Sequence, residues 1–156
     1  MNYWLFKTEP DEFSIDDLAA VDAQGECWEG IRNYQARNFL RDQTNVSDLV
    51  FIYHSSCKKV GIAGIGKIVK AAFADPFQFD PESKYYDPKS TEESPRWFAV
   101  QVGFVEKFSE IITLAELKSS PALEEMRLLK RGNRLSIMPV EKEHWQTIID
   151  MKEKRR

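Results

Sequence analysis

The run GIAGIGKIVKAAF, residues 61–73, decides the fold class. Small residues alternate in it with β-branched ones, which indicates a strand. Gly61, Gly64 and Gly66 fall inside this strand, where glycine marks a bulge or a close approach of two backbones, as at the corners of a small barrel. The run opens no helix, and its glycines lack the spacing of a dinucleotide-binding loop. We therefore expect a bent strand of a small barrel.

Four further runs predict the other main strands. They are YWLFK at 3–7, LVFIYH at 49–54, WFAVQVGF at 97–104 and RLSIMPV at 134–140, the last as a closing strand or extended segment. Short helices are expected at 15–20, 33–40, 121–129 and 141–151, and no β-α-β rhythm repeats. The sequence therefore predicts an α+β fold, a mixed β-barrel of about five or six strands with short flanking helices.

Length and composition indicate one soluble domain. The chain has 156 residues, and we expect residues 1–152 to form the domain and 153–156 a basic tail. No run reaches the roughly 20 apolar residues of a membrane span, and the N-terminal residues do not resemble a signal peptide. Cys27 and Cys57 fit a reduced cytoplasmic protein, and too few cysteines and histidines are present for a structural zinc site. We expect no metal, no cofactor and no membrane contact, and we favour a monomer.

The charge balance excludes a protein that binds nucleic acid by bulk electrostatics. The formal net charge is −3, whereas domains that depend on phosphate contacts are usually strongly basic. Any binding to nucleic acid must therefore use a local basic patch and a specific pocket.

The segment CWEGIRNYQARN, residues 27–38, has the composition of such a pocket. Trp28 supplies a flat apolar ring, and Arg32 and Asn33 follow it with donors and acceptors. Stacking on aromatic rings and hydrogen bonds to the base edge are how proteins read unstacked bases. The alternative is a core tryptophan at a helix start, with arginine and asparagine as caps and surface groups.

Seven segments together resemble the EVE domain family of the PUA-like superfamily. They are YWLFKTEP (3–10), SIDDL (14–18), WEGIRNYQARN (28–38), FIYHSSCKKVGIAGIGKIVK (51–70), YYDPKS (85–90), PRWFAV (95–100) and RLSIMPV (134–140). They run in order over almost the whole chain. The resemblance implies a PUA-like β-barrel and kinship with YTH domains, which hold a methylated adenine in an aromatic cage. It also implies a reader of modified bases, particularly modified cytosines in DNA.

The resemblance places Trp28 against one face of the base. A second aromatic wall is expected from Trp97, with Tyr53 and Tyr86 as further candidates. The alternative for Trp97 and Tyr53 is a place in the core.

Polar residues expected around the base come from four segments. Asn33 is expected at the base edge, and Arg32 at a carbonyl or phosphate, with a surface ion pair as its alternative. The other expected pocket residues are Lys7 for a phosphate, Thr8, Glu9 for an exocyclic amine, His54 and Ser55 at the rim, and Ser136. The alternatives are an ordinary lysine at a strand end for Lys7, an ion pair with Lys7 or Arg32 for Glu9, and a hydrogen-bonded structural histidine for His54.

The densest basic cluster is RLLKRGNR, residues 127–134. Arg127, Lys130, Arg131 and Arg134 have the spacing of one helical face, which predicts a phosphate-binding patch. A solvated helix face is the alternative reading, and Arg134 also falls in a segment that could line the pocket.

Two other functions stay open at this point. One is a hydrolase or other enzyme acting on a nucleotide or RNA, with His54 working beside Glu9 or Asp87. Adjacent residues of a strand point to opposite faces, however, so His54 is poorly placed to activate Ser55, and we expect a binding module and no catalytic residue. The other is a protein-interaction adaptor that uses the long loop at 74–96.

Overall fold

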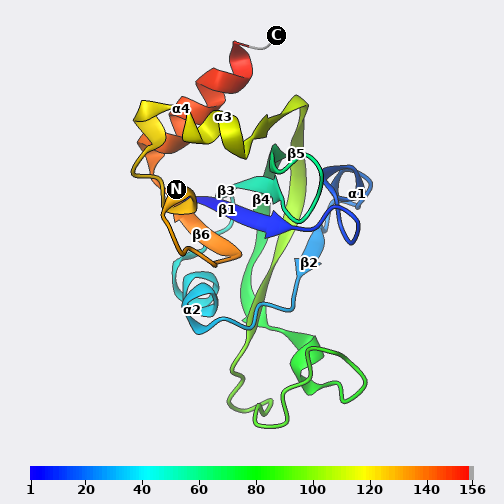
Figure 1. The fold of residues 1–156 in the computed structure, drawn as a ribbon. Coiled ribbons are helices and arrows are strands. Elements are labelled where there is room, and N and C mark those ends of the chain that lie inside the picture. The colour runs from blue at the N-terminus through cyan, green and yellow to red at the C-terminus, as the bar shows by residue number, and fades with distance from the viewer. Residues whose placement is uncertain (155–156) are drawn as a thin grey trace.

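In the computed structural model, which describes residues 1–154, six strands form one mixed sheet (Figure 1). The strands are β1 (Tyr3–Thr8), β2 (Glu26–Trp28), β3 (Leu49–His54), β4 (Gly61–Ala74), β5 (Phe98–Thr113) and β6 (Ile137–Val140). Their order is β2-β5-β4-β3-β1-β6. β1 and β3 run parallel, and the other four neighbouring pairs run antiparallel. The predicted mixed α+β fold is confirmed, although within residues 1–154 the edge strands β2 and β6 do not pair, so the sheet is not closed.

The glycines of β4 bring it close to β5. A Cβ at Gly66 would lie 2.8 Å from the carbonyl oxygen of Gly103, and one at Gly64 would collide with the carbonyl oxygen of Glu106. The register between β4 and β5 shifts beside both glycines. Such bulges bend a strand and increase its twist. The bent strand predicted from these residues is therefore confirmed.

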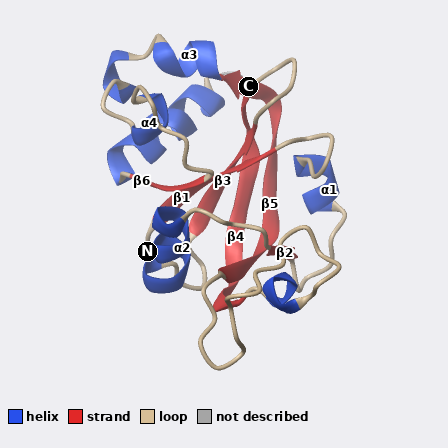
Figure 2. Ribbon diagram, turned by 60° about the horizontal axis from the view of Figure 1, so that its bottom comes forward, coloured by secondary structure: helices blue, strands red, loops and turns tan. Residues whose placement is uncertain are grey.

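Four short α-helices surround the sheet. They are α1 (Ile15–Ala19), α2 (Tyr34–Gln43), α3 (Leu114–Lys118) and α4 (Lys142–Glu153). Figure 2 shows α3 and α4 grouped at one end of the sheet, with α1 and α2 on opposite sides of it. The Ser14 hydroxyl and the Asp17 carboxylate form the capping box that starts α1.

Two helical predictions need correction. Residues 121–129 form two 3-10 turns, η2 (Pro121–Leu123) and η3 (Arg127–Leu129), because Met126 between them is extended, with ψ 132°. At the C-terminus, α4 continues to Glu153, the first residue of the expected tail. Lys152 beside it is 9% exposed, and its ammonium lies 3.0 Å from a Glu106 carboxylate oxygen of β5. Lys154 caps this helix, and the last two residues of the expected tail, Arg155 and Arg156, lie outside the described residues.

The core combines the central strands with the helices. Trp4, Phe6 and Phe51 are fully buried, and the Phe51 ring stacks on Trp145 of α4 with centroids 3.7 Å apart. Trp4 donates its indole N–H to the buried Asp48 carboxylate at 2.9 Å. These contacts hold β1 and β3 side by side, so the side chains at the ends of the two strands are in defined positions.

The long connection between β4 and β5 is pinned at its base. It contains the 3-10 turn η1 (Pro76–Phe79) and extends from the sheet at the bottom of Figure 1. The fully buried Gln78 amide donates to the carbonyl oxygens of Asp75 and Trp97 and accepts from the Trp97 N–H at 3.0 Å. These bonds join the two ends of the connection, so the segment that follows η1 starts from a fixed point.

Candidate nucleic-acid interface

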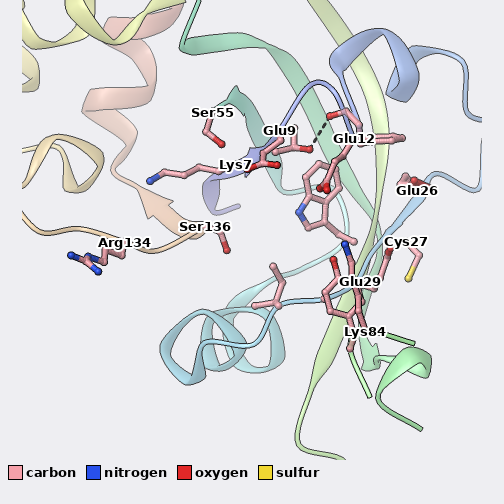
Figure 3. A pocket seen from close by; sticks show the side chains of 16 residues that line it. Lys7, Glu9, Glu12, Glu26, Cys27, Glu29, Ser55, Lys84, Arg134 and Ser136 are labelled. Carbon is pink, nitrogen blue, oxygen red and sulfur yellow. Dashed lines mark hydrogen bonds between the residues drawn. The ribbon is translucent and has the colours of Figure 1, made fainter. Parts of the chain in front are cut away.

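A cavity of about 550 Å³ opens beyond the carboxyl ends of β1 and β3 (Figure 3). We call it the strand-end pocket. Its lining consists of Lys7, Thr8, Glu9, Glu12, Phe13, Glu26, Cys27, Trp28, Glu29, Gly30, Ile31, Ser55, Lys84, Tyr85, Arg134 and Ser136. The volume is in the range of small-molecule sites. Five segments distant in sequence therefore meet around one cavity.

Backbone hydrogen bonds bring three of these segments together. The Lys7 N–H donates to the carbonyl oxygen of Ser136 at 2.8 Å, and the Ser55 N–H donates to that of Thr8 at 2.9 Å. The β1 end thus sits between the turn after β3 and the chain entering β6. This arrangement explains why residues near 7, 55 and 136 share one rim.

Trp28 belongs to both the core and the pocket. It ends β2, is 8% exposed, and its ring centroid lies 5.6 Å from Phe6 and 5.9 Å from Phe13. The Phe13 ring stands edge-on to it, at 88°. Phe13 reaches this position because its N–H, like that of Glu12, donates to the Glu9 carbonyl oxygen and folds the chain back after β1. The two readings of Trp28 are therefore compatible.

The pocket has cationic and acidic sides. In Figure 3, Lys7, Ser55, Arg134 and Ser136 lie on one side, and the carboxylates lie on the other with Cys27 and Lys84. The carboxylates are those of Glu9, Glu12, Glu26 and Glu29. A ligand that fits must present hydrogen-bond donors to the carboxylate side and acceptors or negative charge to the side with Lys7 and Arg134.

Burial shifts the pKa values of several pocket residues in the direction that favours their neutral forms. Desolvation lowers the pKa of Lys7 and raises those of Glu26 and Glu29. The pKa of the Cys27 thiol rises to about 12, first through burial and then through the nearby charges of Glu29, Asp75 and Glu26. Because a thiolate is the reactive form of cysteine, Cys27 is a hydrogen-bond donor at neutral pH and not a nucleophile.

Seven of the predicted site residues share the strand-end pocket. They are Lys7, Thr8, Glu9, Trp28, Ser55, Arg134 and Ser136. The structure draws them from β1, β2, the turn after β3 and the approach to β6.

Five other predicted pocket residues lie outside this lining. Asn33 caps α2, where its side-chain oxygen accepts the Ala36 N–H at 3.0 Å. Arg32 binds Asp75 at 3.0 Å. Tyr53 is 3% exposed and lies beneath the Lys7 ammonium, 5.9 Å from its ring centroid.

His54 and Trp97 are structural as well. His54 accepts the Ile15 N–H on Nε2 at 3.1 Å, and burial lowers its pKa, consistent with a neutral ring. Trp97 donates its indole N–H to Asp87 at 2.7 Å and packs on Tyr34 with centroids 4.8 Å apart. His54 and Asp87 each make an internal hydrogen bond, to the Ile15 N–H and to the Trp97 indole N–H.

The basic cluster does not form one helical face. The 3-10 turn η3 ends at Leu129, and Lys130 after it is extended. Arg127 lies over the Phe39 ring, 5.4 Å from its centroid, while Lys130 pairs with Glu125. Arg131 is exposed, and Arg134 reaches the pocket. The helical phosphate patch is wrong in its geometry, and Arg134 with Lys7 forms the cationic rim instead.

Sequence reasoning missed about half of the lining. Glu12, Phe13, Glu29 and Lys84 carry no local signal of a pocket. Tyr85 falls in the YYDPKS segment, where the sequence pointed to its neighbour Tyr86 instead; Tyr86 is 42% exposed and outside the lining.

Comparison with known proteins decides the family. The family model described as EVE domain matches residues 2–151. The chain belongs to the EVE domain family. This EVE domain is 43% identical to thymocyte nuclear protein 1 of Homo sapiens over 170 residues, covering 98% of this chain and 75% of that protein.

Solved structures of other EVE domain relatives agree closely with this fold. A crystal structure from Pseudomonas putida superposes with a TM-score of 0.91 at 48% identity and covers 96% of this chain and 99% of its own. Human THYN1 in complex with 5-methylcytosine containing DNA superposes with a TM-score of 0.91 at 42% identity, covering 98% of each chain. The EVE resemblance and the fold it implied are confirmed.

Neither a metal site nor a membrane helix is found among residues 1–154. No group of three or more histidine, cysteine, aspartate and glutamate side chains there is arranged to hold a metal ion. None of the helices in that range has the length and apolar character to cross a bilayer.

Proposed function

We propose that this EVE domain, residues 1–152, is a nucleic-acid-binding reader that accommodates a modified cytosine of DNA in the strand-end pocket. The observation that carries the proposal is one cavity that combines aromatic faces, a carboxylate side and a cationic rim. Its support from similarity is the human THYN1 complex with 5-methylcytosine containing DNA, 42% identical to this chain.

The shape of the site favours a single base over a duplex. A cavity of about 550 Å³ encloses one unstacked ring, with Trp28, Phe13 and Ile31 available for apolar contact. Enzymes and readers reach a base by extruding it, which costs a few kcal/mol. The methyl group of a modified pyrimidine would offset part of this cost by contact with these apolar side chains.

The carboxylate side favours cytosine over thymine. Cytosine presents its N4 amine as a donor, whereas thymine presents an oxygen acceptor at the same position. The half-buried Glu29 carboxylate and the exposed Glu9 carboxylate supply acceptors in the lining. Placed against the thymine oxygen, the same groups would repel, so they select by both attraction and repulsion.

The cationic rim suits the DNA backbone. Lys7 and Arg134 line the side of the pocket that lies across from the carboxylates. A flipped nucleotide carries its flanking phosphates to the mouth of its pocket, where such groups can bind them. This local patch reconciles DNA binding with a net charge of −3.

We propose binding and not catalysis. His54 already accepts the Ile15 N–H, and the raised pKa of Cys27 keeps it a thiol, so neither residue is poised to act as a general base or a nucleophile. The two free cysteines also underlie a proposed cytoplasmic location, although the human relative is named a nuclear protein. We further propose a monomer.

The test is a fluorescence-anisotropy titration with short DNA oligonucleotides carrying one central cytosine, 5-methylcytosine or 5-hydroxymethylcytosine. Single strands, duplexes and matched RNA strands form separate arms. We expect saturable binding with a preference for one modified cytosine. Equal affinity for every oligonucleotide, abolished by salt, would refute the proposal and leave only backbone binding.

Two variants locate the site. Trp28→Ala removes an aromatic face but also a core contact, so its folding must be checked by circular dichroism. Glu29→Gln keeps the shape and removes a charged acceptor, a change expected to weaken binding to modified cytosine at least about tenfold. Glu110→Gln, on the distant part of β5, is the matched control and should bind as the unaltered protein does.

A further inference from the structure

We propose that Tyr85 is a second base-contacting wall of the strand-end pocket and that Arg32 and Asp75 position it. The inference rests on the proposed function and deepens it. It assigns an aromatic face that comes from the long β4–β5 connection, far in sequence from Trp28.

The ring of Tyr85 lies directly against the backbone of Gly30. A Cβ added at Gly30 would sit 2.5 Å from Cζ of Tyr85, and 2.7 and 2.8 Å from its two Cε atoms. Gly30 also has a φ of +81°, a conformation that side chains other than glycine rarely adopt. The glycine therefore gives the Tyr85 ring the space it occupies at the pocket wall.

Arg32 holds Tyr85 by its backbone and by its ring. Its Nη2 donates to the Tyr85 carbonyl oxygen at 2.8 Å, and its guanidinium carbon lies 5.4 Å from the Tyr85 ring centroid. The same guanidinium lies 5.2 Å from the Trp97 ring. Arg32 was expected to contact a ligand, but these contacts make it a positioning residue behind the pocket wall.

Asp75 in turn fixes Gly30 and Arg32. It follows β4, is fully buried, and one carboxylate oxygen accepts both the Gly30 N–H at 2.9 Å and Arg32 Nη1 at 3.0 Å. Its other oxygen accepts the Phe77 N–H at 2.8 Å. Asp75 thus joins the segment after β2 to the start of the connection that carries Tyr85.

The pocket wall consequently depends on a chain of contacts. Asp75 orients Gly30 and Arg32, and these orient Tyr85. The neighbouring Tyr86 is not part of this series of contacts, since it is 42% exposed and does not line the pocket. A large amphipathic ring held by fixed groups loses little entropy when a base stacks on it.

The first experiment compares Tyr85→Ala with Tyr86→Ala by titration with a 5-methylcytosine oligonucleotide and its unmodified counterpart. Loss of one stacking ring weakens binding of a base about 5- to 150-fold. We expect a loss of that size for Tyr85→Ala and wild-type affinity for Tyr86→Ala. Equal affinities of the two variants would overturn the inference.

The second experiment tests positioning with a pair of glycines. Gly30→Ala introduces both positive-φ strain and a collision with Tyr85, whereas Gly132→Ala, at φ +82°, introduces the strain with nothing within 4 Å of the new Cβ. We expect at least about fivefold weaker binding for Gly30→Ala and no change for Gly132→Ala. The effect of Gly30→Ala should vanish when Tyr85 is already alanine, because the collision is then absent.

The outcomes separate the two proposals. Persistence of the Gly30→Ala effect in the Tyr85→Ala protein would overturn the positioning argument while wild-type preference for the modified base stands. A wild-type protein without that preference would overturn the proposed function, and the role of Tyr85 as a base-contacting wall would fall with it.

Discussion

Replacing Asp75 by asparagine should destabilise the protein far more than its small change in shape suggests. The aspartate accepts three hydrogen bonds, two on one oxygen and one on the other. Asparagine has one acceptor oxygen, so its NH2 group must face either the Phe77 N–H or the pair of donors from Gly30 and Arg32. The residue is fully buried, so water cannot satisfy the donor left behind.

The magnitude follows from two losses. An unsatisfied buried donor costs about 1–3 kcal/mol. Leaving a buried charge without its partner costs about 3–5 kcal/mol, but the Arg32 side chain is 23% exposed and water offsets part of that loss. We expect the free energy of unfolding to fall by about 2–4 kcal/mol, which lowers Tm by roughly 4–16 °C for a domain of this size.

The assay is urea unfolding followed by circular dichroism, with Asp42→Asn as the matched control. Asp42 also pairs with an arginine, Arg41, but on an exposed face, with side-chain exposures of 49% and 40%. Such exposed pairs add little to stability, because solvent screens the two charges. A loss below about 1 kcal/mol for Asp75→Asn, or equal losses for the two variants, would refute the reasoning that the Asp75 network holds the pocket wall.

Three further predictions follow from the pocket. Glu29→Gln should raise the free energy of unfolding at pH 7. Burial raises the pKa of Glu29, so the stability of the folded protein falls as pH rises through this pKa and the carboxylate ionises in its buried place. Glutamine stays neutral and avoids this loss. Urea titrations should show the gain shrinking toward zero as pH falls below the ordinary glutamate pKa, and a gain that grows on acidification would contradict this sign. Cys27, with a pKa of about 12, stays a protonated thiol at pH 8. Mass spectrometry after iodoacetamide treatment should find it unmodified in the folded chain and alkylated after unfolding. Rapid alkylation of the native protein would disprove the raised pKa. Arg134→Ala should reduce the salt slope of DNA binding by about one and weaken modified and unmodified DNA alike, whereas a change in the modified-to-unmodified ratio would make Arg134 a base contact.

Local sequence determined most of the strands and the ends of several helices. The glycines of residues 61–73 predicted the bulged β4, and the short helix expected at 15–20 is present as α1, capped by its neighbours in sequence, Ser14 and Asp17. These features are set by backbone conformation and nearest neighbours, so a reader of the sequence can find them. The single helix predicted at 121–129 was wrong because no local sequence signal marked the extended Met126, which divides the segment into two 3-10 turns.

The pocket could be predicted only where its residues sit at strand ends. Lys7, Thr8 and Ser55 follow apolar runs, and Trp28 stands out by type. Asn33 was expected at the base edge and His54 at the pocket rim, yet their side chains accept the backbone N–H groups of Ala36 and Ile15. A side chain that can serve a ligand can equally serve a helix start, and composition does not distinguish the two.

Tertiary structure alone decided which aromatic rings face the cavity. Trp97 is the residue type expected in an aromatic cage, but it contacts Asp87 and Tyr34 instead. Tyr85 lies against Gly30 and is held there by Arg32, which is 53 positions away from it in the sequence. The sequence determined the family and the strands because those depend on short-range patterns of apolar residues and glycine. The pocket wall depends on one buried carboxylate, Asp75, that joins two distant segments, and such a contact exists only once the chain has folded.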